Sequence, residues 1–485
     1  MSKAFKDKVI YQIYPASFKD SNNDGRGDIN GIISKLDYLK DLGIGIIWLS
    51  PIYDSPMDDM GYDISDYKNI NPRFGTMQDF ENLISEAKKR DILIVMDLVV
   101  NHTSTEHKRF KEAVKNPKSK YRDYYIIRKG TDKKPPNNWD SCFTGTGREK
   151  LPNSKDEYYL RLYCKTQADL NYKNEAVIQE VEDILKFWLD KGVYGFRCDV
   201  INNIYKTSLN NDSKLKLYFK GSKFYTNQEG MYKILTRFRT EVLDNYETFL
   251  VGETGYISLK EGNRLLNERC LDMFFEFDHI YADKSKMLPV IKRKFSPKRL
   301  VKPIFNWQKN VPYIANYLEN HDQLRSISRY GDEGEYYKES GKMLALFLLS
   351  LKGTPFIFEG EEIGMLNDKN ISLKDGNDVA AKITAETIKK TIHASDKKAE
   401  KMVNETINRD HARTPMQWDD TTNSGFNEGS QTWLHVNENY HEINVKKQLD
   451  DKDSILNFYK KMIKFRNNDE VLKKGDFVEG YCSNK

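Results

Sequence analysis

Side chains that can do acid–base chemistry stand at the ends of several short apolar runs. They are Asp97 and His102 toward the end of one run, Arg197 and Asp199 toward the end of the next, Glu253 in a third, and Glu319, His321 and Asp322 in a fourth. Carboxylates crowded together would repel one another unless arginines and a reaction made use of them. Three converging acids suit glycoside cleavage: one attacks the anomeric carbon, a protonated one donates to the leaving oxygen, and a third stabilises the cationic transition state.

A second set of residues has the spacing of a metal loop. Its candidate oxygen ligands alternate along the chain, at Asp20, Asn22, Asp24, Arg26 and Asp28, with Gly25 at the turn. This spacing resembles the first half of an EF-hand loop and predicts a structural Ca²⁺. The alternative is an Asx/Gly turn that binds no ion. No organic cofactor is expected.

Eight β-rich apolar runs must position the catalytic candidates. They span residues 9–18, 44–53, 92–102, 193–202, 248–255, 273–279, 314–322 and 355–360. Segments with helical periodicity lie between them, at residues 28–42, 77–90, 175–191 and 340–351. The alternation predicts an α/β fold, a (β/α)8 TIM barrel whose candidate residues all face one mouth. An open doubly wound sheet also fits, but no G-x-G-x-x-G follows the first run.

Two connections are too long to be ordinary loops. Residues 103–173 predict a small domain inserted after the third strand, and residues 366–408 follow the eighth strand with helical stretches. Loops at this end of a barrel bind substrates, so both segments should wall the site. We therefore predict a catalytic barrel made of residues 1–102 and 174–475.

Composition and charge exclude several classes of protein. The chain of 485 residues is 39% hydrophobic and 12% aromatic, which excludes a disordered, coiled-coil or collagen-like protein. Its net charge of +5 is spread without a basic block, so neither a nucleic acid nor a membrane is expected as a partner. No secretory signal or membrane span is visible, and five cysteines lack paired spacing. A reduced, cytoplasmic protein is the simplest interpretation.

The strand-ending motifs resemble those of a known enzyme family. They are DLVVNH at residues 97–102, GFRCD at 195–199, VGE at 251–253 and NHD at 320–322. These resemble the four signature regions of the α-amylase superfamily, glycoside hydrolase family 13. QADLN at 167–171, GEEIGM at 360–365 and RTPMQW at 413–418 are similar to motifs of its oligo-1,6-glucosidase subgroup. The resemblance runs from about residue 6 to about residue 475.

The resemblance implies a role for each matching residue. Asp199 would be the nucleophile, Glu253 the general acid/base and Asp322 the stabiliser of the transition state. Arg197 would orient Asp199. His102 and His321 would bind hydroxyls of the sugar whose bond is cleaved.

The same resemblance predicts how the pocket ends. Asp59 and Tyr62 match the pair that holds the non-reducing glucose, and Arg413 is expected to pair with Asp59 and close the pocket. A guanidinium–carboxylate pair is a rigid, bidentate wall, and a closed pocket makes the enzyme exo-acting. The implied activity is that of a retaining exo-α-glucosidase that cleaves short α-1,6-linked gluco-oligosaccharides, of the isomaltose type, through a covalent glucosyl-enzyme.

Linkage preference is predicted from Val200, the residue after the nucleophile. In relatives, valine at this position accompanies α-1,6 preference. A stiff β-branched side chain without a hydrogen-bonding group crowds some orientations of the second sugar. The alternative is that Val200 only packs the top of the barrel.

Other functions share this framework. A trehalose-6-phosphate hydrolase would need basic residues near the second sugar, where Lys284 and Lys286 could serve, although solvated surface lysines are the favoured interpretation. A sucrose isomerase and an α-1,4-glucosidase are further alternatives. The non-catalytic heavy chains of amino-acid transporters also use the fold, but they have a membrane span and lack the full catalytic set.

Relatives carry a β-sandwich of about 80 residues after the barrel. Here little chain follows the last expected helix, at residues 454–467, so residues 476–485 are predicted to be a remnant of a domain that is absent or truncated. An apolar face left uncovered would favour self-association.

Overall fold

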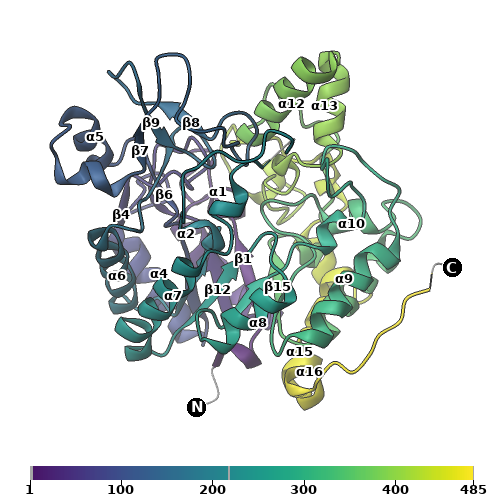
Figure 1. Cartoon of the computed structure of the whole chain (residues 1–485). Helices are drawn as coiled ribbons and strands as arrows, with labels where there is room; N and C mark the ends of the chain where they lie inside the picture. The colour runs from purple at the N-terminus through teal and green to yellow at the C-terminus, as the bar shows by residue number, and fades with distance from the viewer. Residues whose placement is uncertain (1–3, 217–218, 484–485) are drawn as a thin grey trace.

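Eight parallel strands close into a barrel (Figure 1). The computed structural model describes residues 4–216 and 219–483. Around the barrel the strands follow the order β1-β15-β14-β13-β12-β11-β5-β2. They are β1 Ile10–Ile13, β2 Ile46–Leu49, β5 Leu93–Leu98, β11 Gly195–Cys198, β12 Phe249–Glu253, β13 Met273–Phe275, β14 Ala315–Asn316 and β15 Thr354–Phe358. Each lies within one residue of a predicted run, which confirms the (β/α)8 TIM barrel.

Helices surround the barrel (Figure 1). The α-helices are α1 Pro15–Phe18, α2 Ile29–Ser34, α3 Leu36–Leu42, α4 Met77–Lys89, α5 Lys108–Lys115, α6 Glu175–Asp190, α7 Glu229–Glu241, α8 Leu259–Asn267, α9 Pro297–Asn310, α10 Ser326–Tyr330, α11 Tyr337–Ser350, α12 Val379–Ile392, α13 Asp396–Asn404, α14 Val445–Asp450, α15 Ile455–Asn468 and α16 Glu470–Lys474. The 3₁₀ helices are η1 Ala4–Asp7, η2 Lys120–Tyr124, η3 Ile201–Asn203, η4 Ser222–Phe224, η5 Leu243–Asn245, η6 His279–Tyr281, η7 Glu361–Ile363, η8 Arg409–His411, η9 Thr422–Gly425 and η10 Glu438–His441.

The helix predicted over residues 28–42 is broken in two at Lys35. The backbone of Lys35 has φ −112° and ψ 7°, which ends α2 before α3 begins. The Lys35 ammonium lies 4.2 Å from the centre of the Trp418 ring, far away in the sequence. This contact is one that helical periodicity does not encode.

Strand residues alternate between two apolar cores. Ile46 and Trp48 of β2 belong to a cluster drawn from the barrel strands, whereas Ile47 and Leu49 belong to the larger core that includes the helices. Burial on both sides is expected of parallel strands in a closed barrel, and it makes the strands continuous apolar runs. The packed interior leaves the rim at the carboxyl ends of the strands as the place for polar groups.

Two segments stand at the same end of the barrel (Figure 1). The first includes β6 His102–Ser104 paired with β10 Gln167–Asp169, and a three-stranded antiparallel sheet of β7 Ile127–Lys129, β8 Arg148–Lys150 and β9 Glu157–Leu160. The second is the pair α12 and α13. A smaller two-stranded sheet joins β3 Tyr53–Asp54 to β4 Asp66–Ile70. The domain boundaries predicted at residues 103 and 173 stay a prediction.

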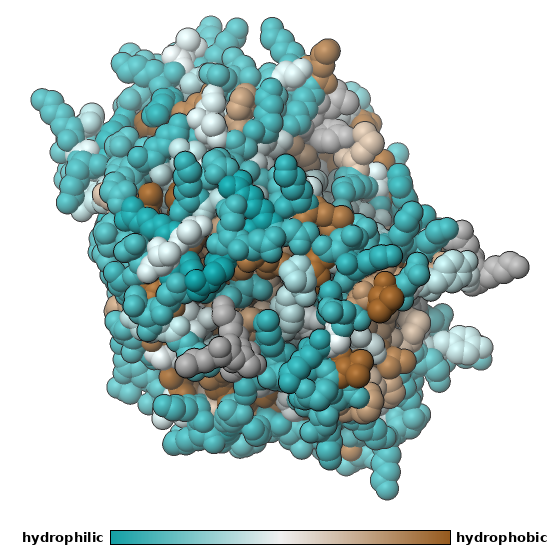
Figure 2. Space-filling view, turned by 60° about the horizontal axis from the view of Figure 1, so that its bottom comes forward, coloured by the Kyte–Doolittle hydropathy of each residue, from teal (hydrophilic) through white to brown (hydrophobic). Residues whose placement is uncertain are grey.

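The described residues contain no membrane-spanning helix and no disulfide. None of their helices has the length and apolar character needed to cross a bilayer. All five cysteines are unpaired. Residues 475–483 form neither helix nor strand, although the Phe477 ring packs 5.0 Å from that of Phe305. The face in Figure 2 is mostly hydrophilic, with apolar side chains in small separate groups.

Candidate active site

Arg197 contacts three carboxylates at the mouth of the barrel. Its Nη1 lies 2.6 Å from Asp97 Oδ1 and 2.7 Å from Asp199 Oδ1. Its Nη2 lies 2.7 Å from Glu253 Oε2. Strands β5, β11 and β12 are neighbours, and the register that sets Arg197 beside Asp97 and Val251 brings these groups together.

These carboxylates share one counter-charge. Burial raises the pKa of Asp97 to about 6, against the opposing charge of Arg197. Burial also raises the pKa of Asp199 well above its ordinary value, although Arg197 opposes the shift and Glu253 adds to it. One guanidinium cannot neutralise three carboxylates, so this cluster retains a proton more readily than isolated acids do. A reaction that needs one ionised and one protonated acid can use such a cluster.

Val200 turns the chain sharply after Asp199. Its φ of 37° and ψ of 37° are left-handed, which is a strained conformation for a β-branched residue. In this turn the Val200 N–H donates to Glu253 Oε2 over 3.0 Å. The Val200 side chain is half-buried and packs against a cluster that includes Leu162 and Tyr163. The strained turn therefore orients Glu253, and the valine side chain lies at the edge of the site.

His321 and Tyr62 form a hydrogen-bonded chain that ends on Asp97. The Gln12 amide donates to His321 Nδ1 over 2.7 Å, which leaves the imidazole proton on Nε2. His321 Nε2 lies 2.6 Å from the Tyr62 hydroxyl, which donates to Asp97 Oδ2 over 3.2 Å. The same Nε2 is 3.3 Å from Asp322 Oδ2. This chain links the acid after β14 to the acid of β5.

Both candidate histidines are neutral at physiological pH. Burial lowers the pKa of His321 to about 3 and that of His102 to about 4. His102 Nε2 lies 3.0 Å from the Tyr62 carbonyl oxygen, so it donates to that oxygen. Neutral imidazoles bind sugar hydroxyls without adding positive charge beside the reacting carbon.

The predicted pairing of Arg413 with Asp59 is wrong. Arg413 Nη2 lies 3.0 Å from Asp322 Oδ1, and Arg413 Nε donates to the His321 carbonyl. Arg409 takes the predicted place: its Nη2 is 3.4 Å from Asp59 Oδ1 and its Nη1 is 3.3 Å from Asp322 Oδ1. The arginine four residues earlier therefore joins the two carboxylates.

Sequence reasoning missed three residues of this site. Arg409 belongs to η8. Gln12 lies in β1 and donates to His321, and Asp378 precedes α12. Arg409 carried a signal, because it belongs to the same short segment as Arg413. Nothing in the local sequence of Gln12 or Asp378 distinguished them from ordinary polar residues.

The two lysines considered for phosphate binding differ. Lys286 is exposed and pairs with Asp278 over 2.7 Å, as expected of a solvated lysine. Lys284 is only 5% exposed, and its Nζ donates to the Thr406 carbonyl over 3.1 Å. Burial lowers the pKa of Lys284 to about 7. The interpretation of Lys284 as a solvated surface lysine is therefore wrong.

The predicted metal loop has a defined conformation. Asp20 accepts hydrogen bonds from the N–H groups of Asn22, Asn23 and Gly25, and Asp28 accepts from Ser21 and caps α2. Asp20 and Asp28 are both buried, and in the described chain neither has a cationic partner. Among the described residues no three His, Cys, Asp or Glu side chains gather as a metal would need. An ion here would also need Asn22 and main-chain oxygen.

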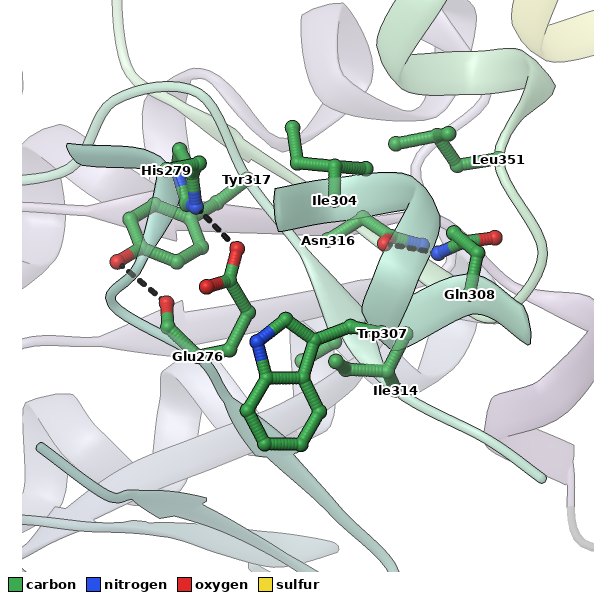
Figure 3. A pocket seen from close by; sticks show the side chains of 10 residues that line it. Glu276, His279, Ile304, Trp307, Gln308, Ile314, Asn316, Tyr317 and Leu351 are labelled. Atoms are coloured by element: carbon green, nitrogen blue, oxygen red, sulfur yellow. Dashed lines mark hydrogen bonds and ion pairs between the residues drawn. The ribbon is translucent and has the colours of Figure 1, made fainter. Parts of the chain in front are cut away.

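None of the site residues described above lines the small cavity drawn in Figure 3. Glu276, His279, Trp307 and Tyr317 are among the residues that line it, and Glu276 pairs with His279. Its volume of about 10 Å³ leaves room for one water at most, so it holds no sugar. The candidate site is the polar mouth of the barrel.

Comparison with known proteins identifies the family. A family model described as the alpha amylase catalytic domain matches residues 12–475. The chain belongs to the α-amylase family. It is therefore a glycoside hydrolase of family 13, as the motifs at the ends of β5, β11 and β12 and after β14 predicted.

Relatives in the α-amylase family cover nearly the whole chain. The oligo-1,6-glucosidase of Parageobacillus thermoglucosidasius is 46% identical over 98% of this chain and 85% of its own length. The trehalose-6-phosphate hydrolase of Bacillus subtilis is 42% identical, over 98% and 84%. The structure of isomaltulose synthase from Erwinia rhapontici matches with a TM-score of 0.94 at 37% identity, over 98% of this chain and 86% of that one.

Proposed function

We propose that the protein is a retaining exo-α-glucosidase that hydrolyses short α-1,6-linked gluco-oligosaccharides from the non-reducing end. The observation that carries this proposal is Arg197, whose guanidinium contacts both Asp199 and Glu253. A shared guanidinium keeps two carboxyl groups close, and retaining enzymes need a separation of about 5–5.5 Å. Curated relatives named oligo-1,6-glucosidase support the linkage.

The reaction proceeds in two displacements. Asp199 attacks the anomeric carbon while Glu253 protonates the leaving oxygen, so the aglycone departs and a glucosyl ester forms. Glu253 then takes a proton from water, which attacks the same carbon and releases Asp199 and α-glucose. Asp322 stabilises the positive charge that develops on the sugar in both steps.

The bridge that Arg409 makes between two carboxylates supports exo action. Arg409 bridges Asp59 and Asp322, and Gln167 donates to Asp59 over 3.0 Å. These groups can hold the hydroxyls of a terminal glucose and leave no path for a longer chain. Measurement of kcat/KM on isomaltose, maltose, sucrose, trehalose and trehalose-6-phosphate tests the proposal, which requires isomaltose to rank first.

A trehalose-6-phosphate hydrolase is the second candidate, since one relative has that name. It would require free cationic groups near the second sugar. Lys284 is buried against the Thr406 carbonyl, and Lys286 is paired with Asp278. Both engagements favour the glucosidase over the phosphate-specific enzyme.

Val200→Thr should move linkage preference. Threonine keeps the β-branch and nearly the volume of valine, so the strained turn is retained while a hydroxyl is added at the edge of the site. We expect the isomaltose-to-maltose ratio of kcat/KM to fall roughly tenfold, about 1.4 kcal/mol of differential transition-state binding. An unchanged ratio in a folded variant would mean that Val200 only packs the barrel top.

We propose further that Asp20, Asn22, Asp24, Arg26 and Asp28 hold a structural Ca²⁺, with Arg26 contributing its carbonyl. The buried and unneutralised Asp20 and Asp28 support a cation here. An ion at 100 times its Kd stabilises the folded state by about 2.7 kcal/mol. Chelation should therefore lower the melting temperature and leave initial rates nearly intact. Asp24→Ala should remove the response to chelator, whereas lost turnover at unchanged folding would contradict a structural role.

We also propose that the protein is cytoplasmic and that it associates with itself. Unpaired cysteines suit a reducing compartment. Met343 and Leu346 of α11 and Phe465 of α15 are about half exposed, which supports association through this face.

A further inference from the structure

Asp378 holds Arg409 by three hydrogen bonds. Its Oδ2 accepts from the Arg409 backbone N–H over 2.8 Å. Its Oδ1 accepts from Arg409 Nε over 3.0 Å and from Nη2 over 2.7 Å. The Asp378 carboxylate is 1% exposed, so these bonds are shielded from water. Every contact of Arg409 with the pocket acids is longer than its contacts with Asp378.

The two segments also hold each other in the opposite direction, through Asp410, the residue after Arg409. Asp410 Oδ2 accepts from the N–H groups of Asn377 and Asp378, over 2.7 Å and 3.0 Å. Asp378 also caps α12 by accepting from the Ala381 N–H. The segment that begins α12 and the segment that carries Arg409 therefore form one unit, although 31 residues separate Arg409 from Asp378.

A second contact fixes this unit over the site. The Arg409 guanidinium lies 5.5 Å from the centre of the Phe143 ring, which belongs to the segment after β6. Next to it, the Thr144 and Thr387 hydroxyls are 3.1 Å apart and join that segment to α12. Arg409 is thus held by Asp378 on one side and covered by Phe143 on another, which leaves few directions for its remaining N–H groups.

We propose that Asp378 is a positioning residue that aims Arg409 at Asp59 and Asp322 and so sets the affinity of the pocket for a terminal glucose. The inference rests on the proposed glucosidase function and deepens it. Without the Asp378 carboxylate, Arg409 would lose its shortest charged contact and could turn toward either pocket acid. The wall that Arg409 forms with Asp59 and Asp322 would then lose its fixed geometry. The hydroxyls of the terminal glucose would meet mobile groups.

The test compares Asp378→Asn with Asp375→Asn. Asparagine keeps the shape and an N-cap oxygen for α12, but loses the charge that holds the guanidinium. Asp375 is exposed in the same segment and, among the described residues, hydrogen-bonds only Ser372, so it is a matched control. Calorimetry measures the Kd of 1-deoxynojirimycin, an iminosugar with the hydroxyl pattern of glucose. We expect Asp378→Asn to raise this Kd about tenfold or more, and Asp375→Asn to leave it unchanged.

Further readouts separate positioning from stability. Because the wall binds ground state and transition state alike, KM for 4-nitrophenyl α-glucoside should rise more than kcat falls. Asp378→Glu should restore part of the affinity. Adding Asp378→Asn to Arg409→Ala should cost no further affinity if Asp378 acts through Arg409. Melting temperatures of all variants report folding.

The outcomes are distinct. Unchanged Kd and KM in Asp378→Asn, or a full additional loss in the double variant, would overturn the positioning role. If the unaltered protein binds the iminosugar but prefers another linkage, the proposed α-1,6 activity fails while the role of Asp378 stands. An unaltered protein that does not bind the iminosugar would contradict both.

Discussion

Replacement of Asp199 by asparagine should lower kcat/KM by about 10⁴-fold. This corresponds to about 5.4 kcal/mol of lost transition-state stabilisation. Asparagine is isosteric but cannot form the glucosyl ester. Its amide oxygen can still accept from Arg197, so the folded site should survive. The measurement is release of nitrophenol from 4-nitrophenyl α-glucoside, with the melting temperature as the control for folding.

Azide can distinguish a nucleophile from an acid that only stabilises charge. In Asp199→Gly, azide should enter the space left by the side chain, attack the anomeric carbon and displace nitrophenolate. The product would be β-glucosyl azide, because a single displacement inverts the configuration. Asp322→Gly should show no such rescue. If azide restored Asp322→Gly and not Asp199→Gly, the two roles would have to be exchanged.

Glu253→Gln should lose about 10²–10⁴-fold of its activity on isomaltose and much less on the nitrophenyl glucoside. The sugar leaving group needs a proton, whereas nitrophenolate leaves with little help. The amide keeps a partner for the Val200 N–H and the Arg197 guanidinium, which both contact Glu253 Oε2 in the structure. The decisive quantity is the ratio of the two losses, measured as kcat/KM.

Equal losses on both substrates would argue that Glu253 is not the acid. Asp272→Asn is unsuitable as a control because Asp272 is bonded to the barrel backbone through Leu250. Glu261→Gln is a better one, since Glu261 takes part in the capping box of α8 with Ser258. It should leave both rates unchanged and should lower stability slightly.

The barrel could be predicted from sequence because its determinants are local. Each strand is buried on both faces, so runs such as residues 92–102 stay apolar until they reach the mouth. The acids then stand where the runs end, and parallel strands bring those ends together. Asp97, Arg197 and Glu253 therefore meet in the structure as their positions in the sequence indicated.

Tertiary structure decided which arginine closes the pocket. Arg409 and Arg413 belong to one short segment, and their spacing favours neither. The choice depends on Asp378, which reaches Arg409 from the start of α12, and on Phe143, which comes from another segment. Charge pairs between distant segments have no periodicity along the chain, so sequence spacing could not predict them.

Distant segments also decided the surroundings of Lys284 and Lys35. A lysine in a polar loop is ordinarily solvated, yet the segment around Thr406 covers Lys284 and leaves it one carbonyl partner. At Lys35 a helical pattern is interrupted beside Trp418. The sequence by itself determined the barrel, the family and the candidate catalytic acids, since these follow from local apolar runs and the residues that end them. Only the fold decided the pairing of Arg409 with Asp59 and Asp322 and the burial of Lys284, because both depend on what distant segments bring into contact.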